Sequence, residues 1–169
     1  MFIIKTLYRK IRRIKNRIFW RTSSIKNKVE INNQDLEKTI RSVGVNEGDI
    51  IFVHSSLSAL GYVLGGPNTI VDVLMKLVTE QGTILMPVYP FQGSMYEYFS
   101  FNPVFNVALD KSFMGAVTEN FRNKTEYRSF HPSHSVASWG KDAEWFIKDH
   151  HKDDSPFGKN SPFYKAYLK

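Results

Sequence analysis

The sequence predicts an α/β fold in which a mostly parallel sheet is flanked by helices. The unbroken apolar run at 50–53 is typical of a strand that is buried on both faces, and Thr83–Met86 is predicted to be a second buried strand. The segment between them carries apolar residues at helical spacing. A strand, a helix and a second strand in this order form a βαβ unit, whose strands run parallel and whose crossover is right-handed.

The first predicted element of the folded part is a helix that begins at Asn33 and ends at about Ser42. The Asn33 side chain can cap free N–H groups of the first turn, and Gly44 supplies the left-handed residue that stops the helix. The first strand follows, and a serine-rich loop leads from it to Pro67. Proline suits the first position of a helix because its missing N–H is not needed there. The helix of the βαβ unit is therefore predicted to begin at Pro67 and to end before Gly82.

The segment after the second strand is different, because residues 88–112 are rich in Tyr and Phe but show little periodicity. Open α/β sheets bind ligands at the carboxyl ends of their strands. This aromatic loop is therefore predicted either to line a ligand site or to fold back over the core as a lid. Beyond it the sequence predicts a short helix, a short strand and a helix with Trp145 and Phe146 facing inward, over residues 114–121, 136–139 and 142–150.

Basic residues are concentrated at the start of the chain. Residues 1–28 hold ten of the 23 Lys and Arg residues and no acidic residue, which leaves 13 basic against 16 acidic residues in the remainder. The globular part is therefore mildly acidic, and we expect no nucleic-acid partner. Residues 1–28 also place apolar side chains on one helical stripe, which predicts an extra basic amphipathic helix, an arm that contacts an anionic membrane surface. A solvated arm that packs on its own domain or on a partner is the alternative.

The absence of cysteine narrows the chemistry, because it excludes disulfides, a thiol nucleophile and cysteine-based metal sites. The glycine patterns of Rossmann and P-loop phosphate sites are absent from the sequence as well. His150 and His151 beside Asp153 and Asp154 suggest a metal site, but adjacent residues rarely bind one ion together on regular structure. We interpret these four residues as a solvated helix end and predict no metal site.

The serine-rich loop joins a buried strand to a helix, a connection that can present successive backbone N–H groups to an anion. Ser55, Ser56 and Leu57 stand at its start, and the Gly65-Gly66 turn follows. The three residues are candidates for holding a phosphate group, and an ordinary loop or helix cap is the alternative. His54, at the end of the strand, is interpreted as a structural residue that points into the core or the loop.

Two histidines, His131 and His134, lie on either side of Pro132. Proline restricts the residue before it to an extended conformation, so the two imidazoles are held in a defined relation. Such a ring can act as a base or donate a hydrogen bond to a carbonyl or a phosphate. The alternative is structural, with a ring that bonds to a backbone carbonyl and fixes the loop.

Four blocks of the sequence are distinctive in their order and spacing. They are Gly48–Gly61 with Gly65-Gly66-Pro67, Phe130–Ala137, Asp142–Trp145 with His150-His151, and Pro156-Phe157-Gly158 with Asn160-Ser161-Pro162. Together they resemble the aminoglycoside 3-N-acetyltransferase family, over roughly Asn33 to Lys169. Members of that family continue through another strand to a motif of the type Asn-Thr-Thr/Ser-x-His and then to further acidic residues, and their principal catalytic histidine lies in that later half. Residues 33–169 are therefore expected to be the N-terminal, coenzyme-side part of such a domain, apparently truncated, with the principal base beyond Lys169.

The resemblance implies an acetyl-CoA-dependent N-acetyltransferase that acts on an amino group of an aminoglycoside or an amino sugar. The amine would attack the thioester directly, without an acyl-enzyme. The resemblance implies coenzyme contacts at Ser55, Ser56 and Leu57, and His131 and Ser133 are further candidates for coenzyme binding. The basic arm favours acetylation of an amino sugar in cell-surface polysaccharide synthesis, by a cytoplasmic protein at the inner face of the membrane.

His134 and Glu97 are the candidate catalytic residues within this chain. Glu97 lies in the aromatic loop, where a carboxylate would attract and orient a cationic amine, and Asp110 is the second choice. The nearest approach to the pyrophosphate loop of the GNAT acetyltransferases, at 41–46, follows a helix and ends in the wrong residue. The alternative function is a catalytically inactive remnant that serves as a CoA-binding or partner-binding module. Its unclosed sheet edge would favour a homodimer. A purely structural membrane-arm protein is a third reading.

Overall fold

The computed structural model describes residues 30–169, so the arm predicted over residues 1–28 lies outside the described residues. The described elements, in chain order, are β1 (Glu30–Ile31), α2 (Asn33–Ser42), β2 (Ile50–Phe52), α3 (Leu57–Leu60), β3 (Tyr62–Val63), α4 (Pro67–Val78), β4 (Thr83–Pro87), α5 (Met95–Phe99), α6 (Ala116–Lys124), β5 (Tyr127–Arg128), β6 (Val136–Gly140), α7 (Ala143–Ile147), the 3-10 helix η1 (His150–Lys152) and α8 (Pro162–Leu168). They form an α/β fold with a four-stranded sheet in the order β2-β4-β6-β5 and a small parallel pair, β1-β3.

The predicted βαβ unit is present, since β2 and β4 pair in parallel and α4 connects them. The rest of the sheet corrects the prediction of a mostly parallel arrangement, because β6 is antiparallel to both β4 and β5. The reason lies in the connections. The chain passes from β4 through α6 to β5, which runs in the same direction as β4, and the short loop 129–135 then returns β6 into the space between them.

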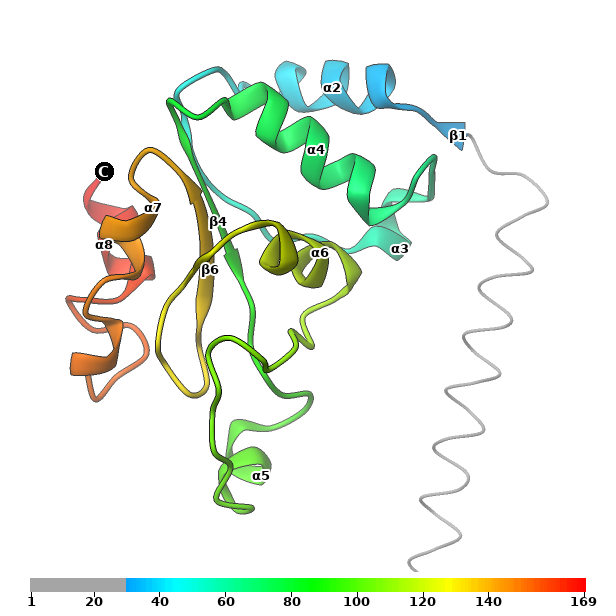
Figure 1. The fold of residues 1–169 in the computed structure, drawn as a ribbon. Helices are drawn as coiled ribbons and strands as arrows, with labels where there is room; N and C mark the ends of the chain where they lie inside the picture. Colours follow the sequence, from blue (N-terminus) through cyan, green and yellow to red (C-terminus); the bar gives the residue numbers. More distant parts are fainter. Residues whose placement is uncertain (1–29) are drawn as a thin grey trace, which may run out of the picture.

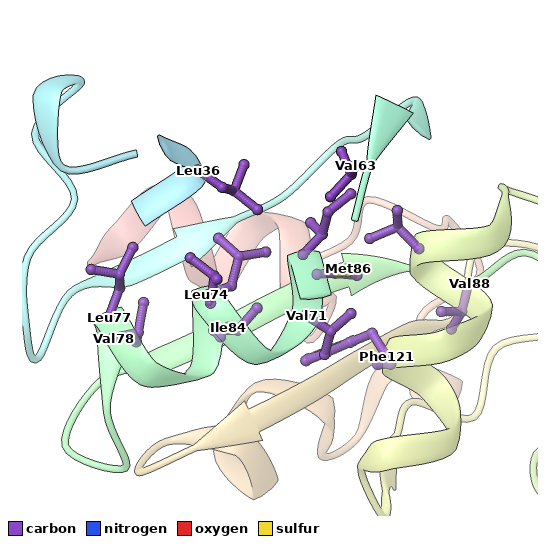
Figure 2. Close-up of a cluster of buried hydrophobic side chains, with 14 residues drawn as sticks. Leu36, Val63, Val71, Leu74, Leu77, Val78, Ile84, Met86, Val88 and Phe121 are labelled. Atoms are coloured by element: carbon purple, nitrogen blue, oxygen red, sulfur yellow. The ribbon is translucent and has the colours of Figure 1, made fainter. Parts of the chain in front are cut away.

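The sheet is covered by helices on both faces, which gives three layers (Figure 1). Side chains of β4 alternate between the two faces. Ile84 and Met86 pack in the cluster formed with α2, α4 and α6, and Figure 2 shows this cluster around Val71, Leu74 and Phe121. Leu85 faces the other way, into a smaller cluster under α7 and α8 that contains Val136, Phe146 and the partly buried Phe52 and Phe163. β4 is completely buried as predicted, because it has a helical layer on each side.

Three predictions about local structure need correction. Helix α2 is capped by Asn32 rather than Asn33, since the Asn32 Oδ1 accepts from the N–H groups of Gln34 (2.8 Å) and Asp35 (3.0 Å). Strand β2 is only half-buried, because among the described strands it pairs with β4 alone and lies at the end of the sheet. Helix α7 ends at Ile147, earlier than the predicted 150.

Trp145 does not face inward as predicted. Its side chain is 43% exposed, whereas Phe146 is completely buried. Neighbouring residues on a helix point about 100° apart, so the short α7 can bury only one of the two rings. The ammonium groups of Lys165 and Lys169 instead lie over the exposed indole in cation–π contacts, 5.5 and 5.3 Å from the ring centroid. Among the described residues, no helix combines the length and the apolar character that crossing a bilayer requires.

Candidate functional site

The candidate site lies at one edge of the sheet. The carboxyl ends of the parallel strands β2 and β4 meet there, and the amino end of the antiparallel strand β6 lies beside them, with Pro87 opposite Val136. The serine-rich loop, the aromatic loop and the loop 129–135 therefore leave the sheet at the same edge. Figure 1 shows the aromatic loop and α5 extending beyond this edge.

Two adjoining cavities are bounded by the aromatic loop. The first, of about 540 Å³, is lined by Tyr89, Phe91, Gln92, Gly93, Met95, Phe113, Met114 and His134. The second, of about 410 Å³, shares Phe91, Gln92 and Phe113 with the first and adds Glu97 among its lining residues. The two candidate catalytic residues, His134 and Glu97, therefore line neighbouring cavities with a common aromatic wall. This arrangement suits a ligand with an apolar face and a cationic group.

His134 is half-buried in the wall of the first cavity. Its ring lies 4.6 Å from that of Tyr89 and 5.3 Å from that of Phe157, measured between centroids, and its Nδ1 is 2.8 Å from the Ser133 hydroxyl. Burial lowers the pKa of His134 below its ordinary value of 6.5. The imidazole is therefore mainly uncharged at neutral pH and can accept a proton from a bound group.

His131 has the structural role that was the alternative to coenzyme contact, although through a different bond. Its ring is buried, and its Nδ1 accepts from the backbone N–H groups of His134 (3.1 Å) and Ser133 (3.4 Å) instead of donating to a carbonyl. The ring thereby closes the loop on itself. His131 and Ser133 also line a third cavity of about 690 Å³, next to Phe130 and Pro156.

The interpretation of residues 150–154 as a solvated helix end is wrong for His150, which is completely buried. Its Nδ1 lies 2.9 Å from the Ser129 hydroxyl, and its Nε2 lies 3.1 Å from the carbonyl oxygen of Pro156. Burial lowers the pKa of His150 to about 4. His151 is exposed as expected. Within residues 30–169, no group of three or more His, Asp or Glu side chains is arranged to hold a metal ion.

Ser55, Ser56 and Leu57 lie at the same edge of the sheet but do not line the cavities of His134 and Glu97. The Ser55 hydroxyl is buried without a hydrogen-bond partner among the described residues, Ser56 precedes the short helix α3, and Leu57 packs against the main core cluster. His54 does not point into the core, which was one of the two predicted directions. It is exposed and stacks on Phe52 at 5.3 Å between ring centroids.

A continuous series of aromatic rings connects the serine-rich loop with His134. Phe52, at the end of β2, stacks on Phe163 at 5.1 Å, and Phe163 contacts Phe157 at the same separation. Phe157 in turn contacts the His134 ring edge to face, at 5.3 Å. The serine-rich loop and His134 are thus linked by packed aromatic rings, but they do not line a common cavity.

Arg128 is an important residue that the sequence analysis missed. Its buried guanidinium donates to the carbonyl oxygens of Val88, Val107 and Asp110 and to the Ser135 hydroxyl. Burial lowers its pKa to about 10, so the group stays charged at neutral pH. Arg128 thereby ties both ends of the aromatic loop to the sheet. One arginine in a two-residue strand carries no signal by which a sequence reading could find this role.

The two acidic candidates differ in their surroundings. Glu97 is exposed on α5, a helix whose first turn is capped by the Ser94 hydroxyl. Asp110 accepts from the backbone N–H of Asn106 at 2.9 Å, so its carboxylate stabilises a turn of the aromatic loop. Glu97 is therefore the carboxylate that can face a ligand in these cavities.

Comparison with known proteins confirms the family resemblance. The aminoglycoside 3-N-acetyltransferase family matches residues 52–168. The chain belongs to this family. It is 30% identical, over 153 residues, to the SPbeta prophage-derived aminoglycoside N(3')-acetyltransferase-like protein YokD of Bacillus subtilis (strain 168), a match that covers 80% of this chain and 56% of YokD. It is 32% identical, over 143 residues, to aminoglycoside N(3)-acetyltransferase VII of Streptomyces paromomycinus, covering 75% of this chain and 49% of that enzyme.

Solved structures of family members share the fold. The crystal structure of YokD superposes with a TM-score of 0.73 at 29% identity, covering 85% of this chain and 59% of YokD. AAC-IIIb in its binary complex with CoASH superposes with a TM-score of 0.68 at 28% identity, covering 81% of this chain and 56% of AAC-IIIb. The chain spans about half the length of the curated relatives it matches.

Proposed function

We propose that this chain forms the coenzyme-side part of an acetyl-CoA-dependent N-acetyltransferase that acts on an amino group of an aminoglycoside or amino sugar. The observation that carries the proposal is the half-buried His134 ring, whose pKa is lowered by burial, in the wall of an aromatic cavity next to Glu97. Membership of the family, and the complex of AAC-IIIb with CoASH, support the choice of chemistry.

In the proposed reaction, the amine nitrogen attacks the thioester carbonyl carbon and the carbon–sulfur bond breaks. The proton lost by the amine goes to a base and finally to the sulfur, which leaves as the coenzyme thiol. His134 accepts or relays this proton. The carboxylate of Glu97 attracts the cationic acceptor toward the cavities. No step requires a covalent bond to the protein.

The coenzyme is proposed to lie along the serine-rich loop. Two features support this placement. The Ser55 hydroxyl is buried without a partner among the described residues, and the hydrogen bonds of the described residues use none of the backbone N–H groups of Ser55, Ser56 and Leu57. His131 is a weaker candidate, because its Nδ1 is already occupied by the loop.

Calorimetric titration of acetyl-CoA into the chain tests the coenzyme site. Ser56 is exposed, so Ser56→Trp blocks the loop without changing the core. We expect saturable binding that is at least tenfold weaker in Ser56→Trp, about 1.4 kcal/mol, and unchanged in Ser42→Trp, an exposed serine at the end of α2. Equal binding by the two variants, or no binding by the folded chain, would contradict the placement.

Release of the coenzyme thiol in the presence of an aminoglycoside tests the reaction. Because the chain contains no cysteine, a thiol-reactive chromophore reports the coenzyme alone. We expect His134→Ala to slow thiol release about a hundredfold, the lower end of the range found for general acid–base groups, and the exposed His151→Ala to leave it unchanged. Binding of acetyl-CoA without any thiol release would instead favour a catalytically inactive CoA-binding module.

The location of the protein is proposed from composition, and a homodimer is proposed from the sheet. We propose that residues 1–28 bring the chain to the anionic inner face of the membrane, which would favour amino sugars of cell-surface polysaccharides as acceptors. Co-flotation with anionic liposomes should be lost when these residues are deleted. The position of β2 at the end of the sheet supports a homodimer through this edge, and light scattering that finds a monomer at micromolar concentration would refute it.

A further inference from the structure

His150 is held by hydrogen bonds that fit only the uncharged imidazole. The carbonyl oxygen of Pro156 can only accept, so the His150 Nε2 carries the proton, and the Nδ1 then accepts from the Ser129 hydroxyl. The Ser129 oxygen itself accepts from the backbone N–H of Val136 at 2.9 Å. Both ring nitrogens of His150 and the Ser129 hydroxyl therefore have hydrogen-bond partners. A second proton on His150 would leave the hydroxyl hydrogen of Ser129 without its acceptor.

His131 lies directly against this ring. The two imidazoles stack with centroids 4.5 Å apart and an interplanar angle of 24°. The Nδ1 of His131 accepts the N–H of His134, so this nitrogen must be unprotonated as well. Two charged rings at this separation would repel each other. We call His131 and His150 together the imidazole stack. Its hydrogen bonds and its ring stacking are all favourable only when both rings are uncharged.

We propose that His131 and His150 are positioning residues for His134. Their uncharged stack holds the loop 129–135 in the form that sets the His134 ring in the cavity wall, and a proton on the His131 Nδ1, which displaces the His134 N–H, releases it. Because the proposal concerns position rather than chemistry, it does not rest on the proposed acetyl transfer.

The charged groups around the imidazole stack do not reverse this preference. His131 faces His134 from its own loop and Asp153 from the segment after η1, and burial is the largest influence, which lowers its pKa. His150 faces the same Asp153 and also Lys165 of α8. The Asp153 carboxylate would favour a proton, but it already accepts from the backbone N–H and side-chain amide of Asn160. His151 and Asp154 are exposed residues in the lining of the adjoining cavity.

The test uses the small number of histidines. Since the chain has five, labelling with 15N-histidine gives spectra in which ring nitrogens and backbone amides can be assigned from single substitutions. His131→Asn places a side-chain oxygen near the position of Nδ1, where it can accept the His134 N–H but cannot be protonated. His131→Leu has no acceptor. The two variants therefore separate the hydrogen bond from the bulk of the side chain.

At pH 7.5 we expect both stacked rings to be uncharged, with the proton on Nε2, and the His134 amide to be protected from hydrogen exchange. Its protection factor should fall at least tenfold between pH 7.5 and 4.5, as ring signals of the stack become charged. In His131→Asn the fall should be less than threefold, whereas His131→Leu should lack the protection throughout. A charged ring at pH 7.5, or the same acid-induced loss in His131→Asn, would overturn the proposal even if His131→Leu fails to fold.

Discussion

Replacing Arg128 tests whether one buried guanidinium secures the aromatic loop. In Arg128→Met the carbonyl oxygen of Val88 keeps a second donor, the Ser135 hydroxyl at 2.9 Å. The carbonyl oxygens of Val107 and Asp110 lose the donor that they have in the structure. Hydrogen bonds to a charged group contribute about 1.5 kcal/mol each or more, and the contact of the guanidinium with the Phe105 ring, at 4.9 Å, adds about 0.5 kcal/mol. We therefore expect the free energy of unfolding to fall by about 3–4 kcal/mol.

Urea denaturation followed by tryptophan fluorescence measures this change, since Trp139 lies in β6 beside the loop's anchor. Arg128→Lys should lower the free energy of unfolding by about half as much. Its ammonium group keeps the charge and some of the hydrogen bonds, but it cannot reproduce the planar fork of the guanidinium. Arg41→Met is the control. It removes an exposed ion pair with Glu37, which is expected to contribute little to the free energy of unfolding. If Arg128→Met were no more destabilising than Arg41→Met, the assigned role of the guanidinium would be wrong.

Three further outcomes are expected. Lys165→Met should lower the free energy of unfolding by about 2–3 kcal/mol in thermal or chemical melts, because the Lys165 ammonium donates to the carbonyl oxygens of Trp145, Phe146 and Lys148 at the end of α7. Gly140→Ala should prevent folding or cost more than about 3 kcal/mol, since φ is +103° and the new Cβ would lie 2.1 Å from a backbone oxygen. Stability should decline as pH falls from 6.5 toward 4, by roughly 3 kcal/mol, because the unfolded chain binds a proton that folded His150 resists. His150→Gln should flatten this decline in urea titrations at several pH values.

The parts of the fold that could be predicted from the sequence depend on local patterns. The parallel β2-β4 pair follows from two apolar runs with one amphipathic helix between them. The same apolar character predicted complete burial of both strands, which is correct for β4 but wrong for β2, because β2 lies at the end of the sheet. The position of β6 could not be predicted in this way. Its residues do not indicate which strand it pairs with or in which direction. Only the return of the chain through the loop 129–135 places it antiparallel to β4.

For the candidate site, the sequence indicated residue types but not contacts. His134 lines a cavity, and its catalytic role stays a prediction. His150 was misread because it stands beside a second histidine and two aspartates, a composition typical of a solvated turn. The partners that bury it, Ser129 and Pro156, come from opposite sides of it in the sequence. Hydrogen bonds over such separations leave no periodic signal.

The way the two candidate residues are held suggests that they do different work. The His134 loop is anchored on both sides by buried groups, with Arg128 bonded to Ser135 and Ser129 bonded to both Val136 and His150. Proton transfer needs a donor and an acceptor within hydrogen-bond reach, so a base must be held in place. Glu97 stands on a five-residue helix and is exposed. Attraction of a cation acts over the roughly 8–10 Å of a Debye length and tolerates such freedom. A well-fixed imidazole and a loosely held carboxylate are therefore consistent with the proposed reaction, in which Glu97 attracts the amine and His134 accepts or relays its proton.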